Sequence, residues 1–247
     1  VEASGTRVTV NGNSKIDGFV SGTNITSYGG AVEASGTRVT VNGRTVGGDV
    51  LGDFVYSSGD SAAAQGSIVS VSDTRVGGYV ISSYTEVGQN ASASSTASGT
   101  VVSVKNSEIG SVVYGGYAYN AGSGVAVAEG NRLTLRGGTY DGSIYGSLAY
   151  AAGNTAAAGG NSVTLQGDDV SGGGSPSFNP QNTVIWGSRA LVGRQEYAPS
   201  SPNTLNIIDA KGMTAANIRN FSTVKYILPN MRLRSPCSRS PAARITK

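Results

Sequence analysis

Short apolar–hydroxyl–apolar triplets recur at an almost constant spacing along the first two thirds of the chain. Six copies begin at positions 8, 39, 69, 102, 133 and 163, so the interval between successive copies stays nearly the same. The segment 1–12 recurs without change at 32–43, and the segment 205–207 forms a seventh copy after a longer gap. Self-similarity at this period predicts a solenoid of stacked turns.

A second apolar pattern follows each triplet. Two apolar residues stand four positions apart with a Gly or Ser midway. The copies are Ile16–Val20, Val46–Val50, Val76–Val80, Ile109–Val113 and Tyr140–Ile144. Because side chains alternate along a strand, we expect a second strand here whose small midway residue points inward. A third strand is expected further along each repeat, centred near positions 25, 55, 85, 118 and 149.

Three short strands in each period predict an all-β, right-handed parallel β-helix (β-solenoid) of about seven turns of about 30 residues. One turn cannot bury its own apolar face, whereas stacked turns pair each strand with its equivalent about 4.8 Å away. The right hand follows from the general crossover preference. Antiparallel hairpins in a sandwich or propeller are the alternative, because Asn-Gly at 11–12 and 42–43 is also a hairpin signal.

The repeat divides the chain into three regions. Residues 1–170 hold the regular turns, and residues 171–230 form irregular terminal turns that contain the only tryptophan, Trp186. We expect these turns to cover the open end of the core, with a short helical turn at 215–219. Residues 231–247 lack any strand pattern and are expected to be a disordered, non-native basic tail of the kind an out-of-frame reading gives. A functional basic arm is the alternative.

The net charge of +3 comes from that tail. The segment 1–230 carries 13 basic and 15 acidic side chains, a net of −2, so a nucleic-acid partner is not expected. The single cysteine, Cys237, also lies in the tail and leaves no internal disulfide. No apolar run is long enough to span a bilayer, so this chain is not expected to insert into a membrane. The chain opens within a repeat, which indicates an internal fragment.

The residue types needed for most catalytic sites are missing or dispersed. The chain has no histidine, which removes His-based triads, imidazole zinc ligands and His general bases. Asp168-Asp169 is the only adjacent acidic pair, and its position after a strand favours a turn. Neither the EF-hand nor the calcium nonapeptide pattern occurs. We therefore expect no catalytic residue, no cofactor and no metal ligand.

Tyrosines gather beside the inward residues of the third strand. In the expected register they form an exposed aromatic strip over turns two to five, which could stack on sugar rings or anchor a partner protein. Alternatively, neighbouring rings stack on one another and stabilise the sheet, and a one-residue shift in register would bury them. The candidate residues are Tyr56, Tyr84, Tyr114, Tyr117, Tyr119, Tyr145 and Tyr150.

Several segments resemble the passenger regions of bacterial autotransporters, the type V secreted surface proteins. They are Asn-Ser-Val-Thr-Leu-x-Gly at 161–167, Gly-Ser-Ile-Tyr-Gly-Ser at 142–147, Ala-Ala-Gly-Asn-Thr at 151–155, and the apolar pattern of 203–229. The resemblance covers about residues 1–230. It implies a right-handed β-helix carried through the outer membrane by a C-terminal β-barrel, which is expected in the full-length protein and absent from this sequence.

The resemblance implies a secreted, cell-surface protein anchored at the outer membrane, and a non-catalytic, adhesin-like role in adhesion, aggregation or display. Its partners would be host glycans, surface proteins or further copies of the chain. A glycan-active lyase or hydrolase on a β-helix is one alternative. An ice-binding solenoid is another, because the middle residues of the triplets should form a column of outward hydroxyls. Those residues are Thr9, Thr40, Ser70, Ser103, Thr134 and Thr164.

Overall fold

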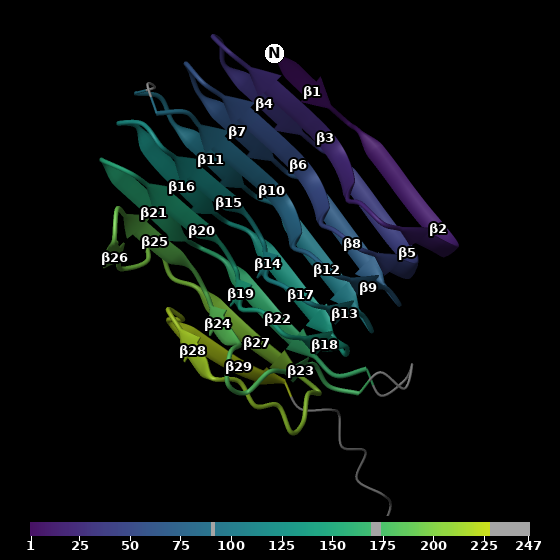
Figure 1. Ribbon diagram of the computed structural model, residues 1–247. Helices are drawn as coiled ribbons and strands as arrows, with labels where there is room; N and C mark the ends of the chain where they lie inside the picture. The colour runs from purple at the N-terminus through teal and green to yellow at the C-terminus, as the bar shows by residue number, and fades with distance from the viewer. Residues whose placement is uncertain (90–91, 169–173, 228–247) are drawn as a thin grey trace, which may run out of the picture.

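The chain folds into a parallel β-solenoid of about seven turns (Figure 1). The computed structural model describes residues 1–89, 92–168 and 174–227, and this part of the chain contains strands and no helix. Equivalent triplets lie side by side, since Val39 pairs with Val8 on one side and Val69 on the other. Leu205 pairs with Val163, so residues 205–207 are the next copy of the repeat. The predicted all-β parallel solenoid is confirmed.

Three sheets run along the solenoid. Sheet A comprises β1 (Glu2–Ser4), β4 (Val32–Ser35), β7 (Ala62–Gln65), β11 (Ser95–Ser98), β16 (Val125–Glu129) and β21 (Thr155–Gly159). Sheet B comprises β2 (Arg7–Ile16), β5 (Arg38–Val46), β8 (Ile68–Ser72), β9 (Arg75–Val76), β12 (Val101–Lys105), β13 (Glu108–Ile109), β17 (Arg132–Arg136), β18 (Thr139–Tyr140), β22 (Ser162–Gln166), β23 (Ser177–Phe178), β27 (Thr204–Ile208) and β29 (Thr223–Ile227). Sheet C comprises β3 (Val20–Ser27), β6 (Val50–Ser57), β10 (Val80–Val87), β14 (Val113–Tyr114), β15 (Tyr117–Asn120), β19 (Ile144–Tyr145), β20 (Leu148–Ala151), β24 (Val184–Trp186), β25 (Arg189–Val192), β26 (Gln195–Tyr197) and β28 (Asn217–Arg219).

The expected second strand is a corner between sheets B and C. Val46 ends β5 and Val50 begins β6, and the residues between them form no strand. The prediction was wrong because two buried residues four apart also arise where a chain turns a corner around one core. Gly48, expected to point inward, is only half buried. A Cβ there would lie 2.9 Å from the carbonyl oxygen of Gly18 in the preceding turn, which explains the small residue.

The expected third strand lies in sheet C, as in β6 around position 55. Sheet A adds a strand that was not expected, and a glycine joins it to sheet B. These glycines have φ between +62° and +68°, a conformation that costs glycine little because it has no Cβ. They are Gly5, Gly36, Gly66, Gly99, Gly130 and Gly160. The register of β22 with β27 aligns Pro202 with Gly160, and proline cannot adopt a positive φ. Sheet A accordingly ends at β21.

The interior has two apolar compartments of different character. The larger lies between sheet B and the first part of sheet C and holds mainly Val, Ile and Leu, such as Val69, Leu133 and Ile144. The smaller lies between sheets A and C, and over turns four to six it holds alanines such as Ala128 and Ala149. Alanine suits this position because the two sheets approach closely and a larger side chain would overfill the space.

The C-terminal turns depart from the repeat. The expected helical turn at 215–219 is wrong, since Asn217–Arg219 forms β28, which pairs with β24. Residues 189–197 form an antiparallel hairpin of β25 and β26 on the edge of sheet C. The whole of the expected basic tail, 231–247, and Asp169 lie outside the described residues. Trp186, expected only as part of an irregular turn, is aligned with Tyr145 of the preceding turn.

Candidate ligand-binding face

The outer face of sheet C carries three columns of side chains, one residue per turn in each. The first column is Leu51, Ile81, Tyr114, Tyr145, Trp186 and Arg219. The second column is Phe54, Tyr84, Tyr117, Leu148 and Arg189. The third column is Tyr56, Glu86, Tyr119, Tyr150 and Leu191. The parallel register produces these columns, because it places equivalent residues of successive turns side by side.

The rings of the first two columns form one continuous stack. Phe54 stacks on Tyr84 with centroids 5.3 Å apart, and Tyr84 meets Tyr117 edge to face at 4.9 Å. Tyr117 stacks on Tyr114 at 5.3 Å, which joins the second column to the first. In the first column Tyr145 then stacks between Tyr114, at 5.1 Å, and Trp186, at 5.9 Å. Each such pair contributes about 0.5–1.5 kcal/mol beyond its buried area.

All seven tyrosines singled out in the sequence lie on this face and are half buried. Tyr84, Tyr114, Tyr117 and Tyr145 belong to the continuous stack, whereas Tyr119 and Tyr150 form a separate stacked pair at 5.1 Å. Stacking thus accounts for much of the surface of these rings, as the alternative interpretation of the strip anticipated. What a ligand can reach is the hollows between the columns and the ring edges beside them.

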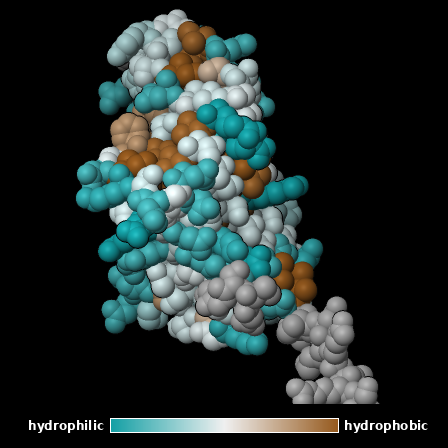
Figure 2. All heavy atoms as spheres, turned by 90° about the vertical axis from the view of Figure 1, so that its right-hand side faces the viewer, coloured by the Kyte–Doolittle hydropathy of each residue, from teal (hydrophilic) through white to brown (hydrophobic). Residues whose placement is uncertain are grey.

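A hollow of about 410 Å³ opens where the first column changes from aromatic to aliphatic residues. Leu51 and Ile81 are shorter than Tyr114, the next member of the column, so they leave space beside the rings. The lining residues are Asp49, Leu51, Phe54, Tyr79, Ile81, Tyr84, Tyr114 and Tyr117. Asp49 and Tyr79 come from the corners between sheets B and C, the side shown in Figure 2, where hydrophobic residues gather toward the upper turns and hydrophilic residues cover most of the rest.

Burial affects three of the phenols around this hollow. It raises the pKa of Tyr84 and Tyr114 well above the usual value for tyrosine, and it raises that of Tyr117 to about 12. The Tyr84 hydroxyl also donates a hydrogen bond of 2.8 Å to Glu86, which favours the neutral phenol further. Asp49 Oδ1 accepts a hydrogen bond of 2.7 Å from the Tyr79 backbone N–H. The hollow therefore offers neutral rings and one carboxylate.

A second hollow of about 420 Å³ lies along the third column. Tyr56, Glu86 and Tyr119 line it together with backbone and small side chains of the adjoining loops. Each hollow on sheet C thus has one acidic side chain, Asp49 in the first and Glu86 in the second. Glycoside hydrolysis commonly requires two carboxylates flanking one bond, and neither hollow supplies that pair.

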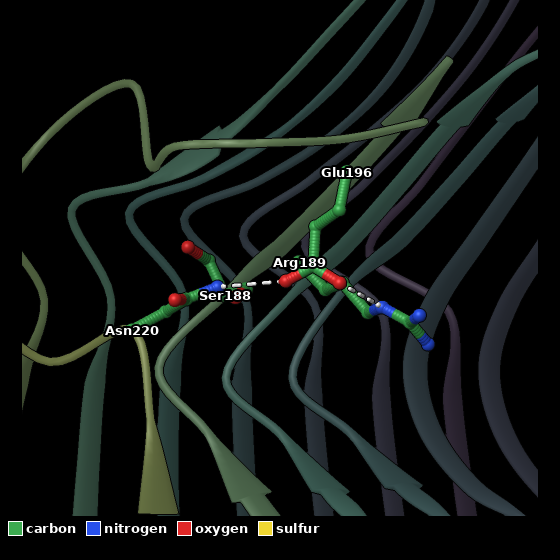
Figure 3. Close-up of polar contacts among 4 residues, drawn as sticks. All are labelled: Ser188, Arg189, Glu196 and Asn220. Atoms are coloured by element: carbon green, nitrogen blue, oxygen red, sulfur yellow. Dashed lines mark hydrogen bonds and ion pairs between the residues drawn. The ribbon is translucent and has the colours of Figure 1, made fainter. Parts of the chain in front are cut away.

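The opposite end of the first two columns is closed by arginines. The Cζ atoms of Arg189 and Arg219 lie 4.9 and 5.2 Å from the centre of the Trp186 ring. Arg189 Nε donates to Glu196 Oε2 at 3.2 Å, and Asn220 Nδ2 donates to Glu196 Oε1 and to the carbonyl oxygen of Ser188 (Figure 3). Glu196, on the β26 strand of the hairpin, therefore holds a guanidinium against the last ring of the stack.

Behind the face, a layer of polar side chains separates the two apolar compartments. In turns four to seven it is an asparagine ladder, formed by Asn131, Asn161 and Asn203, in which each side-chain Oδ1 accepts a backbone N–H from the preceding turn at 2.9–3.0 Å. The amide nitrogens of Asn161 and Asn203 donate to Ser147 and Ser188 of sheet C at 2.7 and 2.8 Å.

In turns one to three the same layer consists of hydroxyls around one carboxyl group, Asp53. Ser67 and Ser83 donate hydrogen bonds to its Oδ2. Its Oδ1 has no hydrogen-bond partner among the described residues, and the side chain is fully buried. Burial raises the pKa of Asp53, and hydrogen bonds from the surrounding hydroxyls offset part of that rise. No signal in the sequence distinguished Asp53 from the acids placed in turns.

The remaining acids fit structural roles or isolated positions. Asp168 is buried, its Oδ1 lies 2.9 Å from Arg136 Nη2, and its backbone forms an isolated antiparallel bridge with Gly174. Asp169 lies outside the described residues, so the turn expected for this acidic pair stays a prediction. Glu2 and Glu33 lie side by side, exposed, over a hollow of about 230 Å³ on sheet A. The described residues contain no group of three or more His, Cys, Asp or Glu side chains that could hold a metal ion.

Sequence reasoning missed several residues of this face. Phe54 and Leu148 were recognisable as neighbours of the tyrosines. Leu51 and Ile81 were not singled out, although they stand at the same place in successive repeats, and Asp49 was not distinguished from the other acids in turns. Trp186 was missed as a member of the first column because the interval that separates it from Tyr145 is longer than one repeat and breaks the period.

No protein-family model, no curated protein and no solved structure matches the chain. Within the described ranges 1–89, 92–168 and 174–227, the chain has no helix suited to crossing a membrane.

Proposed function

We propose that this chain is a non-catalytic, adhesin-like passenger solenoid of a bacterial surface protein, which binds a partner through the outer face of sheet C. The observation that carries the proposal is the stack of rings along that face, interrupted by a hollow of about 410 Å³. Aromatic rings combine a large apolar surface with a polar edge and are enriched in binding surfaces for that reason. The stacked turns beneath them supply a rigid support.

The surface location and the secretion route rest on the autotransporter-like segments at 142–147 and 161–167. The role in adhesion rests on the geometry, because a repeating face multiplies weak contacts along one partner surface. A glycan-active enzyme is less well supported, since each hollow on sheet C contains a single acidic side chain. Adhesion through this face therefore fits the described residues better than catalysis.

The proposal is tested by measuring the binding of the purified chain to a glycan array and to epithelial cells, with and without the double substitution Tyr119→Ser and Tyr150→Ser. We expect the wild type to bind one of these surfaces and the double variant to bind at least fivefold less while it remains folded, with a melting temperature lowered by the loss of one stacked pair. The matched control is Tyr28→Ser, because Tyr28 is exposed outside the three columns. Equal binding by the wild type and the double variant would remove the third column from the site.

A reducing-sugar release assay on bacterial and host polysaccharides separates adhesion from catalysis. We expect no release above the buffer blank. Release that disappears in Glu33→Gln would contradict the non-catalytic proposal and would assign the reaction to the Glu2–Glu33 pair on sheet A, whose carboxylates face one hollow.

A further inference from the structure

The two ends of the ring stack differ in whether a cationic side chain lies against the rings. At the C-terminal end, the Trp186 ring has guanidinium groups within about 5 Å, and Glu196 pairs with one of them. At the N-terminal end, the hollow has rings and the carboxylate of Asp49, while its lining contains no lysine or arginine. Both ends of the stack thus have aromatic rings and a carboxylate, but only the C-terminal end also has a guanidinium group between them.

The charge and shape of the hollow suit a guanidinium on an apolar stem. Asp49 is the one acidic residue of the lining, which contains no lysine or arginine. The hydrogen bond from the Tyr79 backbone N–H uses Oδ1 and fixes the carboxylate, which leaves Oδ2 for a ligand donor. A neutral sugar could donate hydroxyl hydrogen bonds to this carboxylate, whereas a guanidinium would add an ion pair to the hydrogen bonds. A planar guanidinium stacks on rings and is less strongly hydrated than an ammonium group.

We infer that the hollow binds an arginine side chain presented by a partner protein. The methylene stem would lie on Leu51 and Ile81, and the guanidinium would lie against the rings of the second column and the Asp49 carboxylate. The inference rests on the proposed function, because it names the partner chemistry of the same face. It selects a protein surface with an exposed arginine from the wider set of adhesion partners.

The test uses the full chain and two small probes, acetyl-arginine amide and acetyl-citrulline amide. Citrulline has nearly the same shape as arginine and no charge. Binding is followed by the shifts of tyrosine ring protons in NMR titrations. We expect arginine to bind at least tenfold more tightly than citrulline, with the largest shifts on Tyr79, Tyr84 and Tyr114. Equal affinity for the two probes would overturn the inference, as would tighter binding of a neutral disaccharide than of arginine.

Two substitutions locate the site. Asp49→Asn keeps an oxygen for the Tyr79 N–H and removes the charge, so we expect arginine affinity to fall about fivefold. Leu51→Tyr continues the aromatic column and fills the hollow, so we expect binding to be lost while the melting temperature stays the same or rises. Tyr28→Ser, outside the three columns and the hollow lining, should leave arginine affinity unchanged. Undiminished binding in the folded Leu51→Tyr variant would exclude the hollow.

The outcomes also separate this inference from the proposed function. If the wild type adheres to cells and the Leu51→Tyr variant adheres equally well, the adhesin proposal stands and the arginine site is wrong. If the wild type adheres to no glycan, cell or protein surface, the adhesin proposal itself fails, whatever the small probes show.

Discussion

In turns two and three, the strands of sheet C have a hollow on their outer side and a buried carboxyl group, Asp53, on their inner side. In turns five and six, the equivalent strands of sheet C have closely stacked rings on their outer side and the asparagine ladder on their inner side. Both halves follow the same repeat and register. The difference therefore comes from the side chains placed on a common backbone. On sheet C, the C-terminal strands have stacked rings outside and paired amides inside, whereas the N-terminal strands have a hollow outside and an unpaired carboxylate oxygen inside.

Departures from full packing and full hydrogen bonding cost stability, and natural proteins keep them mainly at functional sites. The unpaired Oδ1 of Asp53 and the hollow beside Phe54 occur on opposite sides of one strand, β6. Their coincidence supports the N-terminal half of sheet C as the binding region. It also predicts that substitutions in the two halves will change stability in opposite directions.

The largest effect is expected for Trp186→Ala. Trp186 is only 5% exposed, and its ring contacts Tyr145 and both arginines at the closed end of the stack. Its removal leaves a cavity and should lower the free energy of unfolding by about 3–5 kcal/mol. The measurement is urea unfolding followed by circular dichroism. Trp186→Tyr keeps a stacked ring and should lose less than half as much; equal losses would show that stacking at this end is unimportant.

Asn161→Ala tests the asparagine ladder. The substitution removes the acceptor for the Asn131 N–H and the donor to Ser147, both of which are buried. Because buried groups are left without partners, we expect a loss of about 2–3 kcal/mol in the free energy of unfolding. Asn154→Ala is the matched control, since Asn154 is exposed and should cost no more than about 0.5 kcal/mol.

Asp53→Asn is expected to stabilise the protein at neutral pH. Burial raises the folded-state pKa of Asp53 above its unfolded value. The resulting stabilisation of the protonated form is fully present below the unfolded pKa, about 4, and is lost as the pH rises through the folded pKa. Asparagine avoids the buried charge, so we expect a gain of about 1–2 kcal/mol at pH 7.

The gain from Asp53→Asn should shrink as the pH falls toward 4, because the wild-type carboxyl group becomes protonated there. Urea unfolding of the two proteins between pH 4 and pH 8 measures the difference. Asp60→Asn, at an exposed turn, serves as the control and should show no such trend. A stability difference between wild type and Asp53→Asn that is independent of pH would mean that the buried charge is not the cause.

The smallest effect is expected for Arg219→Ala at the closed end of the stack. The guanidinium is exposed, so its contact with the Trp186 ring should contribute about 0.5–1 kcal/mol to the free energy of unfolding. Arg219→Lys should keep part of this contribution. The control is Arg44→Ala, at an exposed position. If Arg219→Ala lowers the free energy of unfolding clearly more than Arg44→Ala does, the contact between Arg219 and the Trp186 ring is stabilising, and an equal or smaller loss contradicts this.

Much of the fold could be predicted from the triplets, because one buried residue on each side of an outward hydroxyl defines both the strand and its face. Val69 and Val71 are buried around half-buried Ser70, as expected. Sheet A was missed because its inward residues, such as Ala64 and Ala97, are small and give weak apolar alternation. The corner at 47–49 was mistaken for a strand because both flanking valines point to the same core.

The candidate site was predictable only in part. The register of the third strand places the tyrosines side by side, so their gathering on one face followed from the sequence. Their half burial did not, since it depends on ring orientations that differ between the stacked and edge-to-face pairs. The hollow forms because the Ile81 side chain is shorter than that of Tyr114, the residue beside it in the next turn. The repeat pattern of the sequence shows these two residues only as equivalent positions, so it does not reveal the hollow.

The glycine that closes each turn has a consequence for how such a chain can change over generations. Because each of the first six turns contains its own left-handed glycine and pairs with its neighbours in the same register, a gene segment encoding one such turn can be duplicated or deleted in frame without disturbing the others. The unchanged copies at 1–12 and 32–43 are what a recent duplication of that kind leaves behind. The length of the solenoid is therefore a heritable variable that recombination can adjust in steps of one turn.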